Sequence, residues 1–165
     1  MFIPPPELVV WETPHWRVNQ RCDAVLPGYL MIGAKDPEGQ DFASLSSAAL
    51  AELGPVLQRT QNAVREILQP VHLYLSRWGH DAGHTVHFHL IPVCDWVVAA
   101  YEADARYRQL HDFYTRPPTT AAEFDGPDMA LFICREFAEG KTPPAIVGPS
   151  VAEVVTRLRQ VLAAS

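Results

Sequence analysis

The sequence has no long apolar run, which argues against a protein that spans a membrane by helices. Its longest apolar stretches, such as residues 96–101 and 145–147, fall far short of the roughly 20 residues that a membrane-spanning helix needs. The first residues contain neither a basic region nor an extended apolar region, so they do not resemble a secretory signal. We therefore expect neither a membrane protein nor a secreted one.

Cysteines and basic residues are also scarce. Cys22, Cys94 and Cys134 are odd in number and far apart, which fits reduced thiols in the cytoplasm better than a disulfide framework. Lysine and arginine number 13 against 19 acidic residues, and the net charge is −6. Long nucleic acid is bound through clustered basic residues, so such a partner is not expected. A small anionic substrate needs only a local group of positive charges.

The apolar content that the chain does have is enough for one globular domain. Of its 165 residues, 48% are hydrophobic and 19% are charged, which is typical of a single folded unit. Leucines and valines at steps of three and four residues predict a long helix from Ser46 or Ser47 to Leu68. We expect Pro55 to kink this helix or to start it afresh, and Pro70 to end it.

Short β-branched and aromatic stretches predict the strands. They cover residues 8–11, 15–18, 29–34, 71–78, 86–93 and 129–134. Further helices are predicted over residues 96–114 and after Ser150, whose spacing to Glu153 is that of a capping box. Strands before and after one long helix, joined mostly by short turns, predict an α+β fold with an antiparallel β-sheet of about five to six strands and additional C-terminal helices.

Histidines form the most informative cluster, because His80, His84, His87 and His89 fall within ten positions. Side chains alternate between the two faces of a strand. His87 and His89 therefore share one face, and Phe88 points to the other face, which we expect to be the core. His84 lies three residues before His87, which is the wrong parity for the same face if the strand already runs there.

Three interpretations of these histidines are open on the residues alone. In the first, they are polar positions on the solvent side of a sheet. In the second, they are ligands of zinc or iron, and His80, His84 or an aspartate such as Asp81 or Asp95 completes the metal site. In the third interpretation one histidine is a nucleophile, because neutral imidazole can be phosphorylated or nucleotidylated. That chemistry requires one ring nitrogen to attack while an acceptor holds the other as a donor.

Residues 85–92, Thr-Val-His-Phe-His-Leu-Ile-Pro, resemble the motif of the histidine triad (HIT) family of nucleotide hydrolases and transferases. The second and third histidines of the motif match, and Thr85 stands in place of the first. The resemblance extends in the family's order from about residue 8 to about residue 97, through segments 16–19, 27–32, 45–46 and 83–86. When the alignment is anchored on Gly83 instead, Thr85 matches the family's phosphate-contacting Ser or Thr. His87 faces the site in both alignments.

The resemblance implies a nucleotidyl hydrolase that cleaves a dinucleoside polyphosphate or a nucleoside phosphoramidate at the α-phosphate. His87 would be the nucleophile, water would hydrolyse the nucleotidyl-histidine, and His89 would contact phosphate oxygens. Other residues would bind the phosphates and the nucleoside: Gly83, His84 and Thr85 the leaving phosphate, and Asn19 the nucleoside, with Arg21 or Asp23 as its possible replacements. Asn19 has a loop-capping role as its alternative.

The resemblance further implies a homodimer that needs no catalytic metal and no cofactor. Residues 1–115 would form the catalytic domain, and residues 116–165 a C-terminal extension, a strand plus a helix, packed on the same domain. Two other classes of function stay open: a non-catalytic nucleotide-binding protein, if Thr85 is disabling, and a His-x-His metalloprotein. Trp78 and Trp96 are expected in the core or at a dimer contact rather than around a base-binding cleft.

Overall fold

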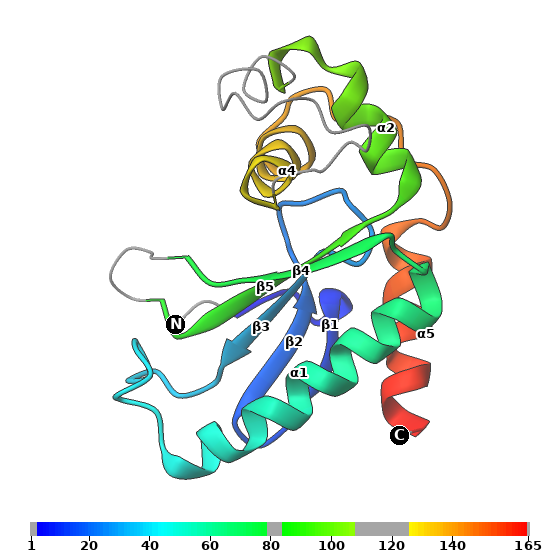
Figure 1. Ribbon diagram of the computed structural model, residues 1–165. Helices are drawn as coiled ribbons and strands as arrows, with labels where there is room; N and C mark the ends of the chain where they lie inside the picture. The colour runs from blue at the N-terminus through cyan, green and yellow to red at the C-terminus, as the bar shows by residue number, and fades with distance from the viewer. Residues whose placement is uncertain (1–2, 79–83, 108–125, 165) are drawn as a thin grey trace.

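Five strands form one antiparallel sheet in the computed structural model, which describes residues 3–78, 84–107 and 126–164 (Figure 1). The strands are β1 (Val9–Glu12), β2 (Trp16–Gln20), β3 (Leu30–Ala34), β4 (His72–Ser76) and β5 (His87–Val93). Their order in the sheet is β1-β2-β3-β5-β4, and every neighbouring pair is antiparallel. The expected α+β fold with an antiparallel sheet is confirmed, and β5, which carries the histidine motif, lies inside the sheet.

Helices surround this sheet on both faces (Figure 1). In the described part of the chain they are the short η1 (Pro6–Leu8), α1 (Ser47–Leu68), α2 (Asp95–Ala103), α4 (Gly126–Ile133), the π-helical turn η2 (Cys134–Ala138) and α5 (Val151–Ala164), together with helical residues 105–107. None of these helices is both long enough and sufficiently apolar to span a bilayer.

The long helix α1 begins as the sequence predicts. The hydroxyl of Ser46 accepts a hydrogen bond of 3.1 Å from the backbone N–H of Ala49, which satisfies one of the donors left unpaired at a helix start. Pro55 lies inside α1, so the helix neither ends nor restarts there, although proline removes one backbone donor. Gln69 then closes the helix in a left-handed conformation, with φ of 46°, just before Pro70.

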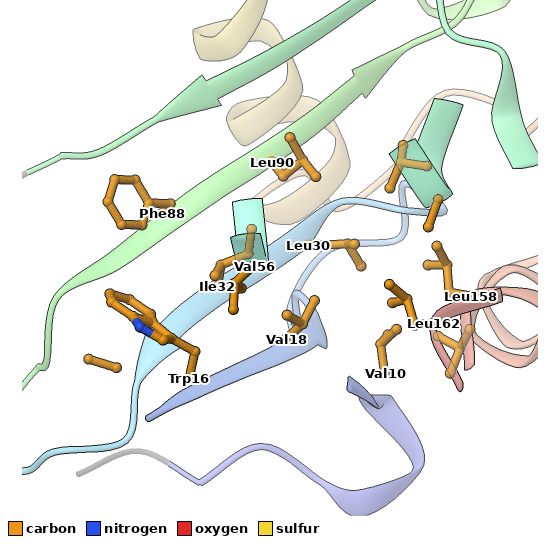
Figure 2. Close-up of a cluster of buried hydrophobic side chains, with 14 of the residues drawn as sticks. Val10, Trp16, Val18, Leu30, Ile32, Val56, Phe88, Leu90, Leu158 and Leu162 are labelled. Atoms are coloured by element: carbon orange, nitrogen blue, oxygen red, sulfur yellow. The ribbon is translucent and has the colours of Figure 1, made fainter. Parts of the chain in front are cut away.

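One face of the sheet packs against α1 and α5 and forms the first core (Figure 2). Alternate residues of the strands point into it, including Val18, Ile32, Phe88 and Leu90, and Leu158 reaches it from α5. This is the face that strand alternation assigns to Phe88 and Leu90. His87 and His89, which alternate with them along β5, therefore face the other side of the sheet.

A second core covers only part of that other side. Ile91 and Val93, at the far end of β5, pack with Tyr29 and with residues of α2 and α4. Trp96 belongs to this packing, with its ring 5.7 Å from that of Phe137, as expected for a core tryptophan. His87 and His89 lie earlier in β5, beyond the buried residues of this core.

One of the predicted elements is wrong, and another is interrupted. Residues 129–134 are not a strand, because Met129 to Ile133 lie in α4 and Cys134 begins η2. The helix predicted over 96–114 is interrupted: α2 ends at Ala103, where the backbone of Asp104 turns to an extended conformation. Residues 105–107 are helical again, and residues 108–114 lie outside the described residues. By contrast, the capping box is present, since Glu153 accepts from the backbone N–H of Ser150 at 2.7 Å and donates its own N–H to the Ser150 hydroxyl at 3.3 Å.

The loop between β2 and β3 is built around the buried side chain of Gln20. Its amide nitrogen donates to the carbonyl oxygens of Leu26 at 2.9 Å and Ala24 at 3.4 Å, and its amide oxygen accepts from the N–H of Gly28 at 3.0 Å. Gly28 has a φ of 77°, which glycine adopts without the penalty that other residues incur. The loop enters β3 through this turn and places Tyr29 directly before the first residue of the strand.

The last helix contacts the first strand. Arg159 of α5 donates hydrogen bonds to the carbonyl oxygens of Val9 at 2.8 Å, Pro6 at 2.9 Å and Glu7 at 3.1 Å. A single guanidinium therefore joins α5 to η1 and to the start of β1.

Candidate active site

The two histidines of the motif stand beside each other on β5, as strand alternation predicts. Their ring centroids are 5.2 Å apart, with the ring planes at 59°. His89 is 8% exposed and His87 is half-buried. In the register of the sheet, Gly33 of β3 lies opposite His87 and Met31 opposite His89, and Arg17 and Asn19 of β2 continue the same two rows. Residues from three strands thus share one surface.

A cavity of about 470 Å³ lies over this surface. Its lining residues come from β2, β3, β5 and the loops beside them: Pro4, Arg17, Asn19, Arg21, Cys22, Asp23, Met31, Gly33, Ala34, Lys35, His84, Thr85, His87 and His89. The lining includes two arginines, one lysine and one carboxylate, and Glu12 beside it pairs with Arg17 and Lys35. These groups leave an excess of one positive charge, although the whole chain has a net charge of −6. The cavity therefore gathers positive charge, which suits an anionic ligand.

His87 is held in one tautomer by the backbone. Its Nδ1 lies 3.0 Å from the carbonyl oxygen of Thr85, which can only accept a hydrogen bond, so Nδ1 carries the proton. In the neutral ring, Nε2 then has the lone pair. This is the arrangement that an imidazole nucleophile requires.

His84 joins the two motif histidines in space. Its ring centroid is 6.3 Å from that of His87, and it lines the same cavity. The expected obstacle of strand parity does not apply, because β5 begins only at His87 and His84 belongs to the preceding loop. Three imidazoles, His84, His87 and His89, therefore line the cavity despite the threonine at position 85.

Thr85 also lines the cavity, but its hydroxyl is engaged elsewhere. It donates a hydrogen bond of 2.8 Å to the carbonyl oxygen of Ala34, at the end of β3. The adjacent backbone pairs the two segments further, with the N–H of Ala34 donating to Val86 at 2.8 Å. The hydroxyl of Thr85 thus uses its proton to join two chain segments. Toward any other group it can act only as a hydrogen-bond acceptor.

Asn19 lies on the same surface and is 6% exposed. Its amide nitrogen donates to the carbonyl oxygen of Gln20 at 2.8 Å, which orients the side chain. Arg21 and Asp23, the residues considered as its replacements, line the cavity too and form an ion pair with each other at 2.6 Å. The hydrogen bond from Arg21 lowers the pKa of Asp23 below its usual value. Gly83 lies outside the described residues.

Tyr29 is a residue of this site that the sequence analysis missed. Its hydroxyl lies 2.9 Å from Nδ1 of His89, and its ring is fully buried at the boundary between the second core and the cavity. In the sequence, Tyr29 lies two and four residues before Met31 and Gly33, so strand alternation places it on their face of the sheet. That face is recognised as the histidine face only when β3 is known to pair with β5. Trp78, which we expected in the core or at a dimer contact, is 38% exposed and lies outside both cores. Its ring packs on His89, with the ring centroids 4.4 Å apart.

The metal interpretation has limited support in the described residues. Among them, no group of three or more His, Cys, Asp or Glu side chains is arranged to hold a metal ion. His80 and Asp81, two of the extra ligands considered, lie outside the described residues. Cys22, Cys94 and Cys134 are free thiols, and burial raises the pKa of Cys22 and of Cys94.

Comparison with solved structures identifies the fold. No protein-family model matches the sequence, and no curated protein matches it either. A Hit-like protein involved in cell-cycle regulation from Bartonella henselae is similar over 95% of this chain and 88% of its own, with 11% identity and a TM-score of 0.54. A hypothetical histidine triad nucleotide-binding protein from Sulfolobus tokodaii is similar over 95% and 84%, with 14% identity and a TM-score of 0.54.

A larger enzyme has the same fold in part of its chain. A uridylyltransferase is similar over 97% of this chain and 42% of its own, with 12% identity and a TM-score of 0.58. At such low identities these matches establish the fold of the chain. It is the histidine triad fold, over nearly the whole of its length.

Proposed function

Given this histidine triad fold, we propose that the protein is a nucleotidyl hydrolase acting through a covalent nucleotidyl-His87. Its substrate is a dinucleoside polyphosphate or a nucleoside phosphoramidate, cleaved at the α-phosphate. The observation that carries the proposal is the backbone-held tautomer of His87, whose Nδ1 lies 3.0 Å from the Thr85 carbonyl oxygen inside a cavity lined by positive charge. The uridylyltransferase among the similar folds supports nucleotidyl transfer as the type of reaction.

The first chemical step forms a bond between Nε2 of His87 and the α-phosphorus. The bond from that phosphorus to the bridging oxygen or nitrogen breaks, and the leaving group departs with the electron pair. A nucleoside polyphosphate leaves as a stable anion, whereas an amine leaving group takes a proton from solvent as it departs. Water then attacks the α-phosphorus, its proton goes to solvent, the bond to Nε2 breaks, and the nucleoside monophosphate is released.

The neighbouring residues supply charge stabilisation. His89, beside His87 at a ring distance of 5.2 Å, donates to a phosphate oxygen. His84, whose ring centroid is 6.3 Å from that of His87, donates to the phosphates as well. Preorganised donors of this kind stabilise the negative charge that develops on the phosphoryl group. Thr85 contributes little as a donor because its hydroxyl is bonded to Ala34. Asn19 contacts the nucleoside from β2, which β3 separates from the histidine strand β5.

The proposal includes the homodimer and the cytoplasmic location that the sequence analysis expects. Strand β4 lies at one edge of the sheet, and Leu75 in this strand is 37% exposed. An edge strand with an exposed apolar side chain is a surface on which a second copy can pack. Light scattering coupled to gel filtration tests the dimer, because a monomer at micromolar concentration contradicts it.

The decisive experiment uses intact-protein mass spectrometry without acid. Wild-type protein is mixed with diadenosine tetraphosphate or, separately, with an adenosine phosphoramidate, and nucleotide products are followed with EDTA present. We expect turnover and an adenylyl adduct in the wild type, and neither in His87→Ala. The control is His72→Ala, which removes an exposed histidine of β4 outside the cavity and should retain both.

Two other outcomes separate the alternatives. Nucleotide binding without turnover or adduct indicates the non-catalytic binding protein and contradicts the proposed hydrolase. Turnover that EDTA abolishes, together with stoichiometric zinc or iron in the protein, indicates the His-x-His metalloprotein instead.

A further inference from the structure

Tyr29 lies at the centre of a hydrogen-bond network that ends on His89. Its hydroxyl is 2.9 Å from Nδ1 of His89, 2.8 Å from Nη1 of Arg21 and 3.5 Å from Sγ of Cys134. Arg21 is fixed in turn by two hydrogen bonds to Asp23, at 2.6 Å and 2.9 Å. The network therefore runs from the carboxylate through the guanidinium and the phenol to the imidazole.

The direction of these hydrogen bonds follows from what each group can do. A guanidinium only donates, so the oxygen of Tyr29 accepts from Arg21. The single phenolic proton then goes to either His89 or Cys134. The imidazole nitrogen is the closer of the two, and it is also a much stronger acceptor than a thiol sulfur. The proton of Tyr29 therefore points at Nδ1 of His89.

We propose that Tyr29 is a positioning residue, which holds His89 as the tautomer with its proton on Nε2. This inference rests on the proposed function, in which the N–H of His89 donates to a phosphate oxygen. Arg21 supports this role. Because Arg21 donates to the oxygen of Tyr29, the phenolic proton points away from Arg21 and toward the imidazole of His89.

The consequence is that two neighbouring imidazoles have opposite polarity. The Thr85 carbonyl makes Nδ1 of His87 a donor and leaves the lone pair on Nε2. The phenol of Tyr29 makes Nδ1 of His89 an acceptor and leaves the proton on Nε2. One ring is thus prepared to attack phosphorus and its neighbour to donate to oxygen, before any ligand is bound.

The surroundings keep Tyr29 a donor. Its ring is fully buried, and burial raises the pKa of Tyr29 above its usual value, so the phenol is protonated at neutral pH. Trp78 packs on His89 at 4.4 Å between ring centroids and limits rotation of the imidazole. The tautomer of His89 is therefore set by the hydroxyl of Tyr29, which donates to an imidazole ring that cannot turn away from it.

The test is nitrogen-15 NMR of histidine rings at pH about 8, where an ordinary imidazole is neutral. In wild type we expect His89 to have its proton on Nε2 and His87 on Nδ1. Tyr29→Phe should shift His89 toward the other tautomer and leave His87 unchanged. Tyr107→Phe is the matched control, since it removes a hydroxyl from the same second core, one that bonds to Glu136, and should change neither ring.

A second variant, Cys134→Ala, tests the same inference in case Tyr29→Phe does not fold. Cys134→Ala removes the competing acceptor and should leave the tautomer of His89 as it is in wild type. If the phenolic proton instead pointed at the sulfur, this variant would change the tautomer, and the inference would be overturned. Unchanged His89 signals in folded Tyr29→Phe would overturn it as well.

Kinetics then separate this inference from the proposed function. If the enzyme turns over nucleotide, Tyr29→Phe should lower kcat by roughly two- to tenfold, the value of one lost hydrogen bond, with KM nearly unchanged. A changed tautomer in Tyr29→Phe combined with no turnover in wild type supports the assignment of Tyr29 and contradicts the hydrolase. Turnover with an unchanged tautomer supports the hydrolase and contradicts the role of Tyr29.

Discussion

Nδ1 of His87 lies 3.0 Å from the carbonyl oxygen of Thr85, two residues earlier in the chain. The acceptor is a main-chain atom, so the tautomer of His87 does not depend on which side chain stands at position 85. This explains how a threonine can replace the first histidine of the motif without disturbing the orientation of the second. His84 brings a third imidazole to the cavity from the loop.

Thr85→Val should therefore change stability more than chemistry. The variant keeps the shape of the side chain but loses the hydrogen bond to Ala34, which lowers the free energy of unfolding by about 1 kcal/mol. Urea titration measures this loss, and turnover should stay within about threefold of wild type if the hydroxyl is not needed for catalysis. A much larger drop in kcat, with the fold intact, would show that the hydroxyl acts on the ligand.

Asp23→Asn should have a pH-dependent effect on stability. Its hydrogen bonds to Arg21 lower the pKa of Asp23 in the folded protein, so the ionised pair stabilises the fold above the unfolded pKa of about 3.9. That contribution is lost as the pH falls through the folded pKa. Because the Asp23 side chain is 59% exposed, we expect less than about 1 kcal/mol. Urea titrations of both proteins between pH about 7 and about 3 should converge, and a constant difference contradicts the assignment.

Two glycine-to-alanine substitutions should act in opposite directions. Gly54 lies inside α1, and an added Cβ meets no described atom within 4 Å, so Gly54→Ala should raise the free energy of unfolding by about 0.5–1 kcal/mol. Gly28 has a φ of 77°, and its Cβ would lie 2.5 Å from Cδ1 of Leu68. Gly28→Ala should cost more than about 1 kcal/mol. Thermal unfolding followed by circular dichroism compares the two, and shifts of the same sign contradict the prediction.

Gln20→Met should be strongly destabilising. The substitution preserves the approximate shape but leaves the N–H of Gly28 and the carbonyl of Leu26 without the partner they have in the wild type. Buried polar groups left in this way cost about 1–3 kcal/mol each. The matched control is Gln61→Met on α1, where one hydrogen bond of 3.3 Å to Leu57 is lost and a change below about 0.5 kcal/mol is expected. Equal effects of the two variants in urea would contradict the role of Gln20.

The sequence predicts most of the sheet and its two faces, because alternation in β5 is a local property. It fails at residues 129–134, where a short continuous apolar run fits a buried strand or a buried helix equally well. The structure makes this segment helical, and it packs among aromatic rings such as Phe132 and Phe137. Pro127 and Asp128, just before the run, are typical of a helix start and were the available signal.

The cavity is harder to predict than the histidines that line it. His87 and His89 follow from alternation along one strand, and Asn19 from the family resemblance. Tyr29 and His84 depend on which strands are neighbours and on where β5 begins, which are tertiary properties. The direction of the hydrogen bond between Tyr29 and His89 depends further on Arg21, from another strand end, so no local pattern contains it.

Arg159 makes the stability of the first strand depend on the last helix. Its three hydrogen bonds to Pro6, Glu7 and Val9 join segments that are about 150 residues apart in sequence. If α5 detaches, η1 and the start of β1 lose these contacts at the same moment, so the two ends of the fold open as one cooperative unit. Amide protons in β1 and α5 should then exchange with solvent at matching rates, slower than those of a fraying end.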